Sequence, residues 1–290
     1  MTGNLRSIVA MLIAVGAFSL MDAVLKTLIG TYPALQVAAL RGLASLPLVC
    51  IYVVWRREVG LLLRVRWRLH LFRGVISIIM LTLFSFALRH LGLAEAYTIF
   101  FVAPLLITIL SIPVLRERVA PVHWLAIAVG MCGVWIALRP DGEALFSWGA
   151  LAVLGAATCY AVSAIAGRVL SRTDASVTLV FWTTISLSLG AGLLALPGWV
   201  DIEARHWWIL AALAVTGFIG QLAITEAFRH GQASAIAPFE YTALAWGIAL
   251  DWTLWRIVPD SYTLLGGAII IASGLYLLRK EKVRTVTIPP

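Results

Sequence analysis

One stretch of this chain occurs twice, and the repeat limits the folds that the chain can adopt. The segment Leu93–Val119 corresponds to Gln232–Val258 further along the sequence. A self-similarity spaced by roughly 140 residues is the mark of a chain built from two copies of one design. We therefore predict a first repeat over residues 1–140 and a second repeat over residues 141–290.

Both copies consist of continuous apolar runs, and these runs identify the solvent. Hydrophobic residues make up 61% of the chain and charged residues only 12%, whereas a soluble domain carries about 25% charged residues. So few charges cannot cover a water-exposed surface, which indicates a lipid bilayer. Backbone polar groups in lipid must be satisfied internally, so continuous apolar runs predict membrane-spanning helices and an all-α membrane protein.

Turn-forming residues such as Pro33 and Pro197-Gly198 divide the apolar runs into ten predicted spans. Most connections are short, which makes successive helices antiparallel neighbours. The predicted spans are residues 7–29, 34–55, 71–89, 93–115, 122–138, 148–170, 176–196, 206–228, 233–255 and 262–278.

The basic residues predict how the helices are oriented. Lys and Arg gather in the loops on one side, which also holds both termini, and cytoplasmic loops are the ones enriched in these residues. Each repeat has an odd number of spans, so the second copy enters the membrane from the opposite side. Inverted repeats are a transporter architecture, with the substrate site near the bilayer midplane between the repeats.

The same composition argues against several other classes of function. The net charge of +8 is explained by topology signals in loops, so we expect no nucleic-acid partner. Cys50, Cys132 and Cys159 fall inside apolar runs without metal-ligand spacing, which predicts small buried hydrophobic residues and no metal site. No phosphate-binding loop is recognisable, and the histidines fall at span ends, so we expect no cofactor and no enzyme activity.

Several motifs, in a fixed order along the chain, give it a family resemblance. They are Arg41, Ala94-x-Ala96, Pro104, the run Leu115-Arg116-Glu117-Arg118-Val119, Trp124 and Gly130–Gly133. With these motifs the chain resembles the drug/metabolite transporter (DMT) superfamily in its ten-helix EamA-type branch, and most closely the aromatic amino-acid and metabolite exporter group. The resemblance implies a multi-pass secondary transporter of the bacterial inner membrane.

The second repeat departs from the first at two of these places. Arg256 stands where Glu117 stands in the first repeat, and Trp182 stands near the place of Arg41. The two halves are therefore not expected to use the same gating residues.

Glu240 is the main candidate for a functional charge within the membrane. An ionisable side chain at the bilayer centre costs roughly 2.5–3.5 kcal/mol, so each such residue needs an explanation. Glu240 lies well inside the ninth span. We interpret it as a ligand for a substrate ammonium group or as the carrier of a coupled proton. The alternative is a purely structural pairing with an arginine or a backbone amide.

Charges near the other end of the membrane allow two interpretations. Asp22 and Lys26 are one helical turn apart and can pair with each other. Arg41 enters the second span at a similar depth. The three residues can form a closed structural ion network. Alternatively, Arg41 faces the cavity and binds a substrate carboxylate, and Asp22 is a second candidate for proton coupling.

An aromatic wall opposite Glu240 would complete the binding site. Tyr97 and Phe101 lie on one face of the fourth span, and Glu240 corresponds to Phe101 in the repeat. Such a pocket suits a zwitterion with an apolar side chain, through cation–π contact and pairing with Glu240. Tyr241 is the next residue along the ninth span. Further candidates that line the cavity are Gln221, Tyr160, Ser163 and Met80.

Two prolines are predicted to act as hinges. Pro104 and Pro238 interrupt the backbone hydrogen bonds of the fourth and ninth spans close to the proposed site.

The sequence as a whole predicts an exporter of amino acids, aromatic or apolar ones among them, or of similar small metabolites, which works by alternating access. One alternative is an exporter of cationic or aromatic drugs, which would also use a broad aromatic cavity. Another is a lipid-carrier-like membrane protein, whose cavity would open sideways into the bilayer. The oligomeric state, the transport direction and the coupling to protons are left open, and a monomer is compatible with the sequence.

Overall fold

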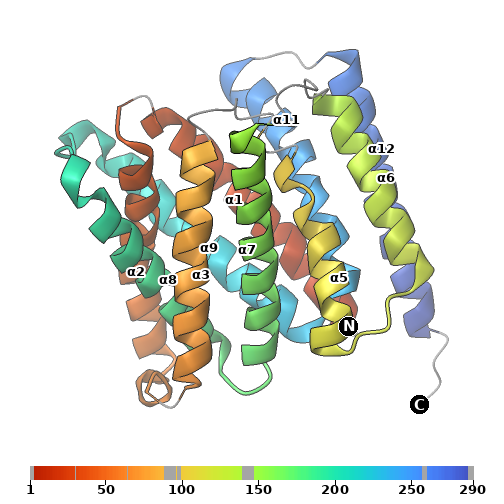
Figure 1. Cartoon of the computed structure of the whole chain (residues 1–290), viewed down its shortest axis with the longest axis horizontal. Helices are drawn as coiled ribbons and strands as arrows, with labels where there is room; N and C mark the ends of the chain where they lie inside the picture. Colours follow the sequence, from red (N-terminus) through yellow and green to blue (C-terminus); the bar gives the residue numbers. More distant parts are fainter. Residues whose placement is uncertain are drawn as a thin grey trace.

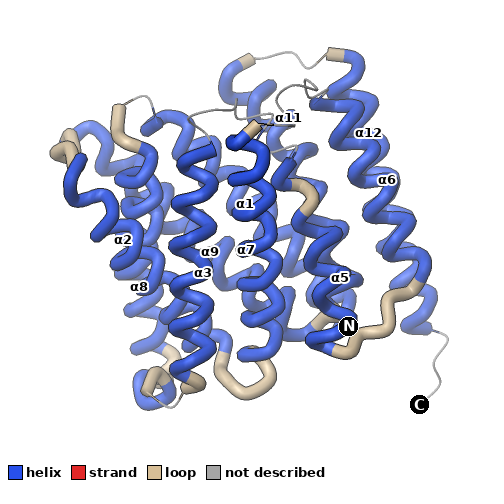
Figure 2. The backbone as a smooth tube through the Cα atoms, in the orientation of Figure 1, coloured by secondary structure: helices blue, strands red, loops and turns tan. Residues whose placement is uncertain are grey.

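The computed structural model describes residues 3–29, 31–63, 65–87, 96, 99–138, 147–256 and 260–286. Every regular element in these ranges is helical, as Figure 2 shows. The elements are α1 (Gly3–Ile29), α2 (Ala34–Trp55), η1 (Val59–Leu61), α3 (Trp67–Ala87), α5 (Ala103–Leu115), α6 (Pro121–Leu138), α7 (Trp148–Leu170), α8 (Ser176–Ala195), η3 (Leu196–Gly198), η4 (Ala204–His206), α9 (Trp207–His230), α10 (Ala233–Ile236), η5 (Ala237–Tyr241), α11 (Thr242–Trp255) and α12 (Ser261–Val286).

The helices match the predicted membrane architecture. Within the described ranges, 6 helices are long and apolar enough to cross a bilayer, namely α1, α2, α3, α7, α8 and α9. Shorter apolar helices occupy the fourth, fifth and tenth predicted spans. The ninth span consists of α10, η5 and α11 in succession. The prediction of an all-helical membrane protein is therefore confirmed.

The packing of the helices relates the two halves of the chain by an approximate twofold axis. α1 packs against α9, and its counterpart α7 packs in the same way against α3. α2 packs against α8, and α6 packs against α12, so each of these helices meets its own counterpart (Figure 1). The boundary predicted between residues 140 and 141 lies outside the described ranges and remains a prediction.

The main hydrophobic core lies where the two halves meet. It gathers buried side chains from both repeats, including Ile8, Met11, Ile107, Ile165 and Leu277. The beginning of α1 and the end of α12 lie at the same end of the bundle (Figure 1). An even number of crossings explains this placement, and the assignment of that end to the cytoplasm remains a prediction.

The fourth and ninth spans are not continuous helices, contrary to the spans predicted for residues 93–115 and 233–255. In the fourth span, Phe101 and Val102 form a turn before α5 begins. In the ninth span, the 3-10 segment η5 separates α10 from α11. Pro104 and Pro238 each lie in the first two positions of the segment that follows the interruption. Proline is tolerated there because an amide hydrogen in the first turn has no helical acceptor.

Two left-handed arginines fix the register between the repeats. Arg116 follows α5 with φ 56°, and Arg256 follows α11 with the same φ of 56°. These caps make Arg116 the counterpart of Arg256, so the correspondence predicted between Glu117 and Arg256 is one residue out of step. In the corrected register Tyr241 is the counterpart of Phe101, and Glu240 is the counterpart of Phe100.

The cysteines differ from the prediction that they are buried. Cys50 and Cys132 are exposed on the outer surface of the bundle, and Cys159 is half-buried. An apolar helix surface that faces lipid accepts a small weakly polar residue as readily as a core does, so hydrophobicity alone did not distinguish the two positions.

Candidate functional site

The interruption of the ninth span positions Glu240 against a tyrosine from α7 of the same repeat. Glu240 lies in η5, and its Oε1 accepts a hydrogen bond of 3.1 Å from the Tyr160 hydroxyl of α7. Phe100 of the first repeat packs on the same tyrosine, with 5.6 Å between the ring centroids. Glu240 and Phe100, one from each repeat, therefore meet at one side chain.

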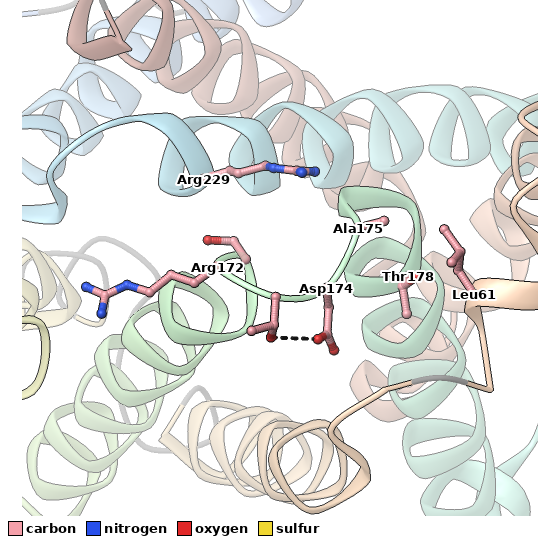
Figure 3. Close-up of a pocket in the computed structure, with 8 residues that line it drawn as sticks. Leu61, Arg172, Asp174, Ala175, Thr178 and Arg229 are labelled. Atoms are coloured by element: carbon pink, nitrogen blue, oxygen red, sulfur yellow. Dashed lines mark hydrogen bonds between the residues drawn. The ribbon is translucent and has the colours of Figure 1, made fainter.

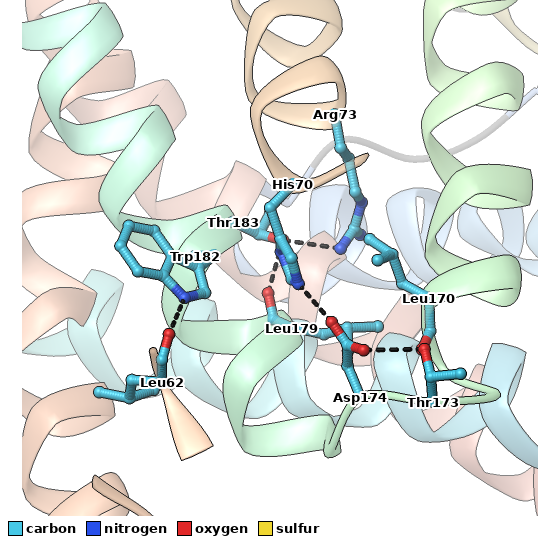
Figure 4. Close-up of polar contacts among 9 residues, drawn as sticks. All are labelled: Leu62, His70, Arg73, Leu170, Thr173, Asp174, Leu179, Trp182 and Thr183. Atoms are coloured by element: carbon cyan, nitrogen blue, oxygen red, sulfur yellow. Dashed lines mark hydrogen bonds and ion pairs between the residues drawn. The ribbon is translucent and has the colours of Figure 1, made fainter. Parts of the chain in front are cut away.

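A buried arginine that the sequence did not assign to the site lies close to this pair. The Arg73 Nε of α3 donates to Ser163 Oγ at 3.3 Å, and a terminal nitrogen donates to Thr183 Oγ1 at 2.7 Å (Figure 4). Arg73 thereby joins α3 to α7 and α8. The charges of Arg41 and Arg73 both act on the hydroxyl of Tyr160.

Helix α7 holds the acidic and the basic group at neighbouring heights. Tyr160 and Ser163 are three residues apart, so they share one face of α7 and are separated by about 4.5 Å along its axis. Tyr160 contacts Glu240, and Ser163 contacts Arg73. One face of α7 therefore presents a carboxylate and a guanidinium to the same region of the bundle.

A second pair of charged residues lies in α1 and α2, about 10 Å along the helices from the loop that joins them. Asp22 of α1 and Arg41 of α2 are close enough to interact electrostatically. The Arg41 guanidinium also lies 5.2 Å from the ring centroid of Phe18, within range for a cation–π contact. Lys26, the third member of the predicted network, has a side chain outside the described set.

Asp22 is exposed even though α1 packs against helices of both repeats. Leu20 is 42% exposed. A separation of two residues turns the helix by about 200°, so Asp22 and Leu20 point to opposite sides of α1. Both sides of α1 are therefore accessible at this level of the bundle.

The other predicted site residues have varied surroundings. Phe101 contacts Tyr241, the residue next to Glu240, with 5.8 Å between centroids. Tyr241 is 1% exposed, and its hydroxyl has no hydrogen-bond partner among the described residues. Gln221 and Met80 are half-buried on α9 and α3. Tyr97 lies outside the described ranges.

The structure also reveals a buried contact between a histidine and an aspartate at the end of the bundle where the chain begins. His70 Nε2 of α3 lies 2.8 Å from Asp174 Oδ2, and the two side chains are only 3% and 4% exposed (Figure 4). Trp182, near the predicted place of an Arg41 counterpart, donates its indole N–H to the Leu62 carbonyl at 3.0 Å. Both contacts join α8 and its preceding turn to the first repeat.

A cavity of about 250 Å³ opens beside Asp174 at this end of the bundle (Figure 3). It is lined by the turn between α7 and α8, together with Leu61 and Arg229. The Arg172 side chain extends away from the cavity in Figure 3 and donates to the Leu115 carbonyl at 3.4 Å. The cavity does not include Glu240 or Tyr160, so it is separate from the central site.

Sequence reasoning missed Arg73, His70 and Asp174 for identifiable reasons. Arg73 lies deep in the third span, and the general rule on buried charges could have selected it. His70 and Asp174 look like residues at the end of a span and in a loop, and nothing local shows that they pair across 104 positions of sequence.

Comparison with known proteins supports the resemblance seen in the sequence. The profile of the EamA-like transporter family matches residues 5–139 and again residues 147–279. A solved crystal structure has the same fold, with a TM-score of 0.80 and 20% identity over 95% of this chain and 96% of its own.

Three characterised relatives transport different small molecules. The chain is 29% identical to the pseudopaline exporter of Pseudomonas aeruginosa, over 91% of this chain and 93% of the exporter. It is 29% identical to the riboflavin transporter of Vibrio cholerae, over 73% and 72% of the two chains. It is 24% identical to the S-adenosylmethionine uptake transporter of Rickettsia conorii, over 73% and 72%. These names include both export and uptake, and none is an enzyme.

Proposed function

We propose, because the chain belongs to the EamA-like transporter family, that this membrane transporter of small metabolites exports amino acids or similar zwitterions from the cell. It would act in the inner membrane by alternating access between its two five-helix halves. Aromatic and apolar amino acids are the first candidates, because Phe100 packs on Tyr160, the hydrogen-bond partner of Glu240, and Phe101 packs on Tyr241.

The observation that carries this proposal is the placement of Glu240. Its carboxylate lies at the interruption of the ninth span, where it accepts a single recorded hydrogen bond from Tyr160. A carboxylate accepts several hydrogen bonds when it is ionised, so capacity remains for a substrate ammonium group. Arginine side chains at Arg41 and Arg73 supply positive charge for a carboxylate in the same substrate.

Pro104 and Pro238 are proposed as the hinges of the transport cycle. Each begins a new segment at the interruption of its span, so each half of the span can reorient without breaking a continuous run of helical hydrogen bonds. Asp22 is proposed as a second proton-coupling candidate, since its side chain is exposed on α1 and interacts electrostatically with Arg41.

Counterflow into proteoliposomes tests the proposal directly. Vesicles loaded with unlabelled amino acid should accumulate the same labelled amino acid, and a panel of aromatic, aliphatic and charged amino acids would rank the substrates. Counterflow of cationic dyes without any amino acid would overturn the proposal in favour of a drug exporter. A reporter fused to each terminus should place both ends in the cytoplasm.

The coupling ion is tested with the same vesicles. If Glu240 carries a proton, an imposed pH gradient should drive accumulation in the wild type and not in Glu240→Gln. A Gln variant that transports at the normal rate and responds normally to pH would remove Glu240 from this role.

A further inference from the structure

We infer that Arg73 binds an anionic group of the substrate, so that Arg73 and Glu240 together hold a zwitterion along one face of α7. The inference rests on the proposed function and makes it more specific, because it assigns the carboxylate to Arg73 rather than to Arg41. It defines the substrate as a molecule with a cationic and an anionic group at its two ends, which the bundle holds at the level of Tyr160 and Ser163.

The first argument is that the charge of Arg73 is not neutralised within the described part of the chain. Its hydrogen bonds go to the hydroxyls of Ser163 and Thr183, and no carboxylate of a described residue lies within ion-pair distance. A cation that is removed from water without an anionic partner is costly, and such residues in membrane spans mark substrate or ion pathways. The missing partner is therefore supplied by a ligand.

Arg41 provides the contrast. It interacts electrostatically with Asp22 and lies over the ring of Phe18. Its charge therefore already has a carboxylate and an aromatic face as partners. Two arginines that look equivalent in the sequence thus differ in whether a carboxylate in the described part of the protein interacts with them, and this decides how readily each can bind a substrate anion.

The surroundings of Arg73 hold its guanidinium in a fixed position. A Cβ atom placed on Gly167 would lie 3.3 Å from Arg73 Cζ, so the guanidinium rests directly against the backbone of α7. Ser163 and Thr183 hold it from two sides. A planar guanidinium with unused N–H groups that is held in this way is suited to a carboxylate, which it can bind through two parallel hydrogen bonds.

Glu240 lies on the same helical face but does not neutralise Arg73. Tyr160 and Ser163, which contact the two charged groups, lie about 4.5 Å apart along the axis of α7, and no ion pair joins Arg73 to Glu240 in the described part of the chain. The two opposite charges are therefore neighbours without being partners. The ammonium and carboxylate of one amino acid fit this arrangement, because each would meet its own counter-ion.

The competing explanation is that Arg73 is only a structural pin between α3, α7 and α8. A pin predicts that removing the guanidinium destabilises the protein and affects all substrates alike. An anion-binding arginine predicts the reverse for stability, since an uncompensated buried charge is retained for function at a cost to the fold.

The first arm of the test measures thermal unfolding of the purified full-length protein without substrate. We expect Arg73→Met to melt at or above the wild-type temperature, whereas Arg41→Met should melt below it because Asp22 loses its partner. If Arg73→Met instead melts as far below the wild type as Arg41→Met does, the structural pin is correct and the inference fails. This arm does not depend on the identity of the substrate.

The second arm compares L-phenylalanine with L-phenylalaninamide, which keeps the ammonium group and lacks the carboxylate. Arg73→Met should lower counterflow of phenylalanine by more than about tenfold and leave phenylalaninamide within about twofold of its wild-type rate. Equal losses for both probes would overturn the inference. If the wild type moves neither probe, amino-acid transport itself is wrong, and the first arm alone decides whether Arg73 carries an uncompensated charge.

Discussion

The two repeats share their backbone and differ in the side chains at the positions that matter for transport. Phe100 and Glu240 occupy equivalent positions at the interruptions of the fourth and ninth spans, and both contact Tyr160. One copy supplies an aromatic surface and the other a carboxylate. We therefore infer that the shared fold provides the scaffold for alternating access, whereas the sequence differences between the copies provide the binding chemistry.

The two ends of the bundle likewise share their backbone arrangement and differ in their side chains. At one end, the Tyr32 hydroxyl in the loop after α1 lies 2.8 Å from His206 Nδ1 beside the start of α9. At the other end, Asp174 in the turn after α7 lies 2.8 Å from His70 near the start of α3. α1 corresponds to α7, and α9 corresponds to α3. The same fold position thus pairs a histidine with a tyrosine hydroxyl at one end and with a buried carboxylate at the other.

Breaking the two histidine contacts should give the largest difference between the repeats. Asp174→Ala leaves a buried ring nitrogen of His70 without its hydrogen-bond partner, so we expect the free energy of unfolding to fall by about 3 kcal/mol. Tyr32→Phe removes half-buried hydrogen bonds of a loop and should cost about 1 kcal/mol. Chemical unfolding of both variants in the same micelles checks the pair. Equal losses would show that the buried carboxylate at His70 adds nothing beyond an ordinary hydrogen bond.

Changing the side chains at the two interruptions, Glu240 and Phe100, should give the next largest difference between variants, measured as transport. Glu240→Gln keeps the shape and a hydrogen-bond acceptor for Tyr160 but removes the charge, so we expect counterflow to fall by about tenfold to a hundredfold. Phe100→Leu, at the equivalent position, should change counterflow by less than about threefold. A comparable loss in the two variants would mean that packing around Tyr160, rather than charge, limits transport.

The residues that follow the fourth and ninth spans should differ in their contribution to the stability of the protein. Glu117 accepts hydrogen bonds from the backbone nitrogens of Ala233 and Ser234 at 3.0 and 3.2 Å, and from Ser234 Oγ at 3.1 Å. It therefore caps α10 across the interface between the repeats. Glu117→Ala should lower the free energy of unfolding by about 1.5–2 kcal/mol.

The control for Glu117 is the exposed Arg256, which lies next to the corresponding position in the second repeat. Arg256→Gln should change the free energy of unfolding by less than about 0.5 kcal/mol. The comparison fails if the arginine variant is destabilised as much as the glutamate variant.

A pair of glycines that look equivalent in sequence should give the smallest difference. A Cβ on Gly133 would lie 2.8 Å from Ile270 and 3.0 Å from the carbonyl oxygen of Gly266, whereas a Cβ on Gly274 would meet nothing closer than 3.9 Å. Gly133→Ala should therefore cost about 1 kcal/mol through overpacking of α6 against α12. Gly274→Ala should stabilise α12 by up to about 1 kcal/mol through higher helix propensity. Thermal unfolding of the two variants should show shifts of opposite sign.

The sequence predicted the membrane setting, the helical class and most helix positions, because these depend on local apolar content. It also selected Glu240, Tyr160 and Ser163, which the structure brings into one region. It placed Phe101 opposite Glu240, and the structure shows Phe101 in ring contact with Tyr241, the residue next to Glu240. Which rings meet between the repeats depends on how the helices pack, so weak similarity at a few small residues could not resolve it.

What the sequence alone determined is that two copies of an apolar five-span unit insert in opposite directions, since hydrophobicity and charge act segment by segment. What only the tertiary structure decided is which buried charges have partners. Asp22 lies beside Arg41, His70 pairs with Asp174, and Arg73 has only hydroxyls around it. The physical reason is that the cost of a buried charge depends on its neighbours in space, and these neighbours come from other helices.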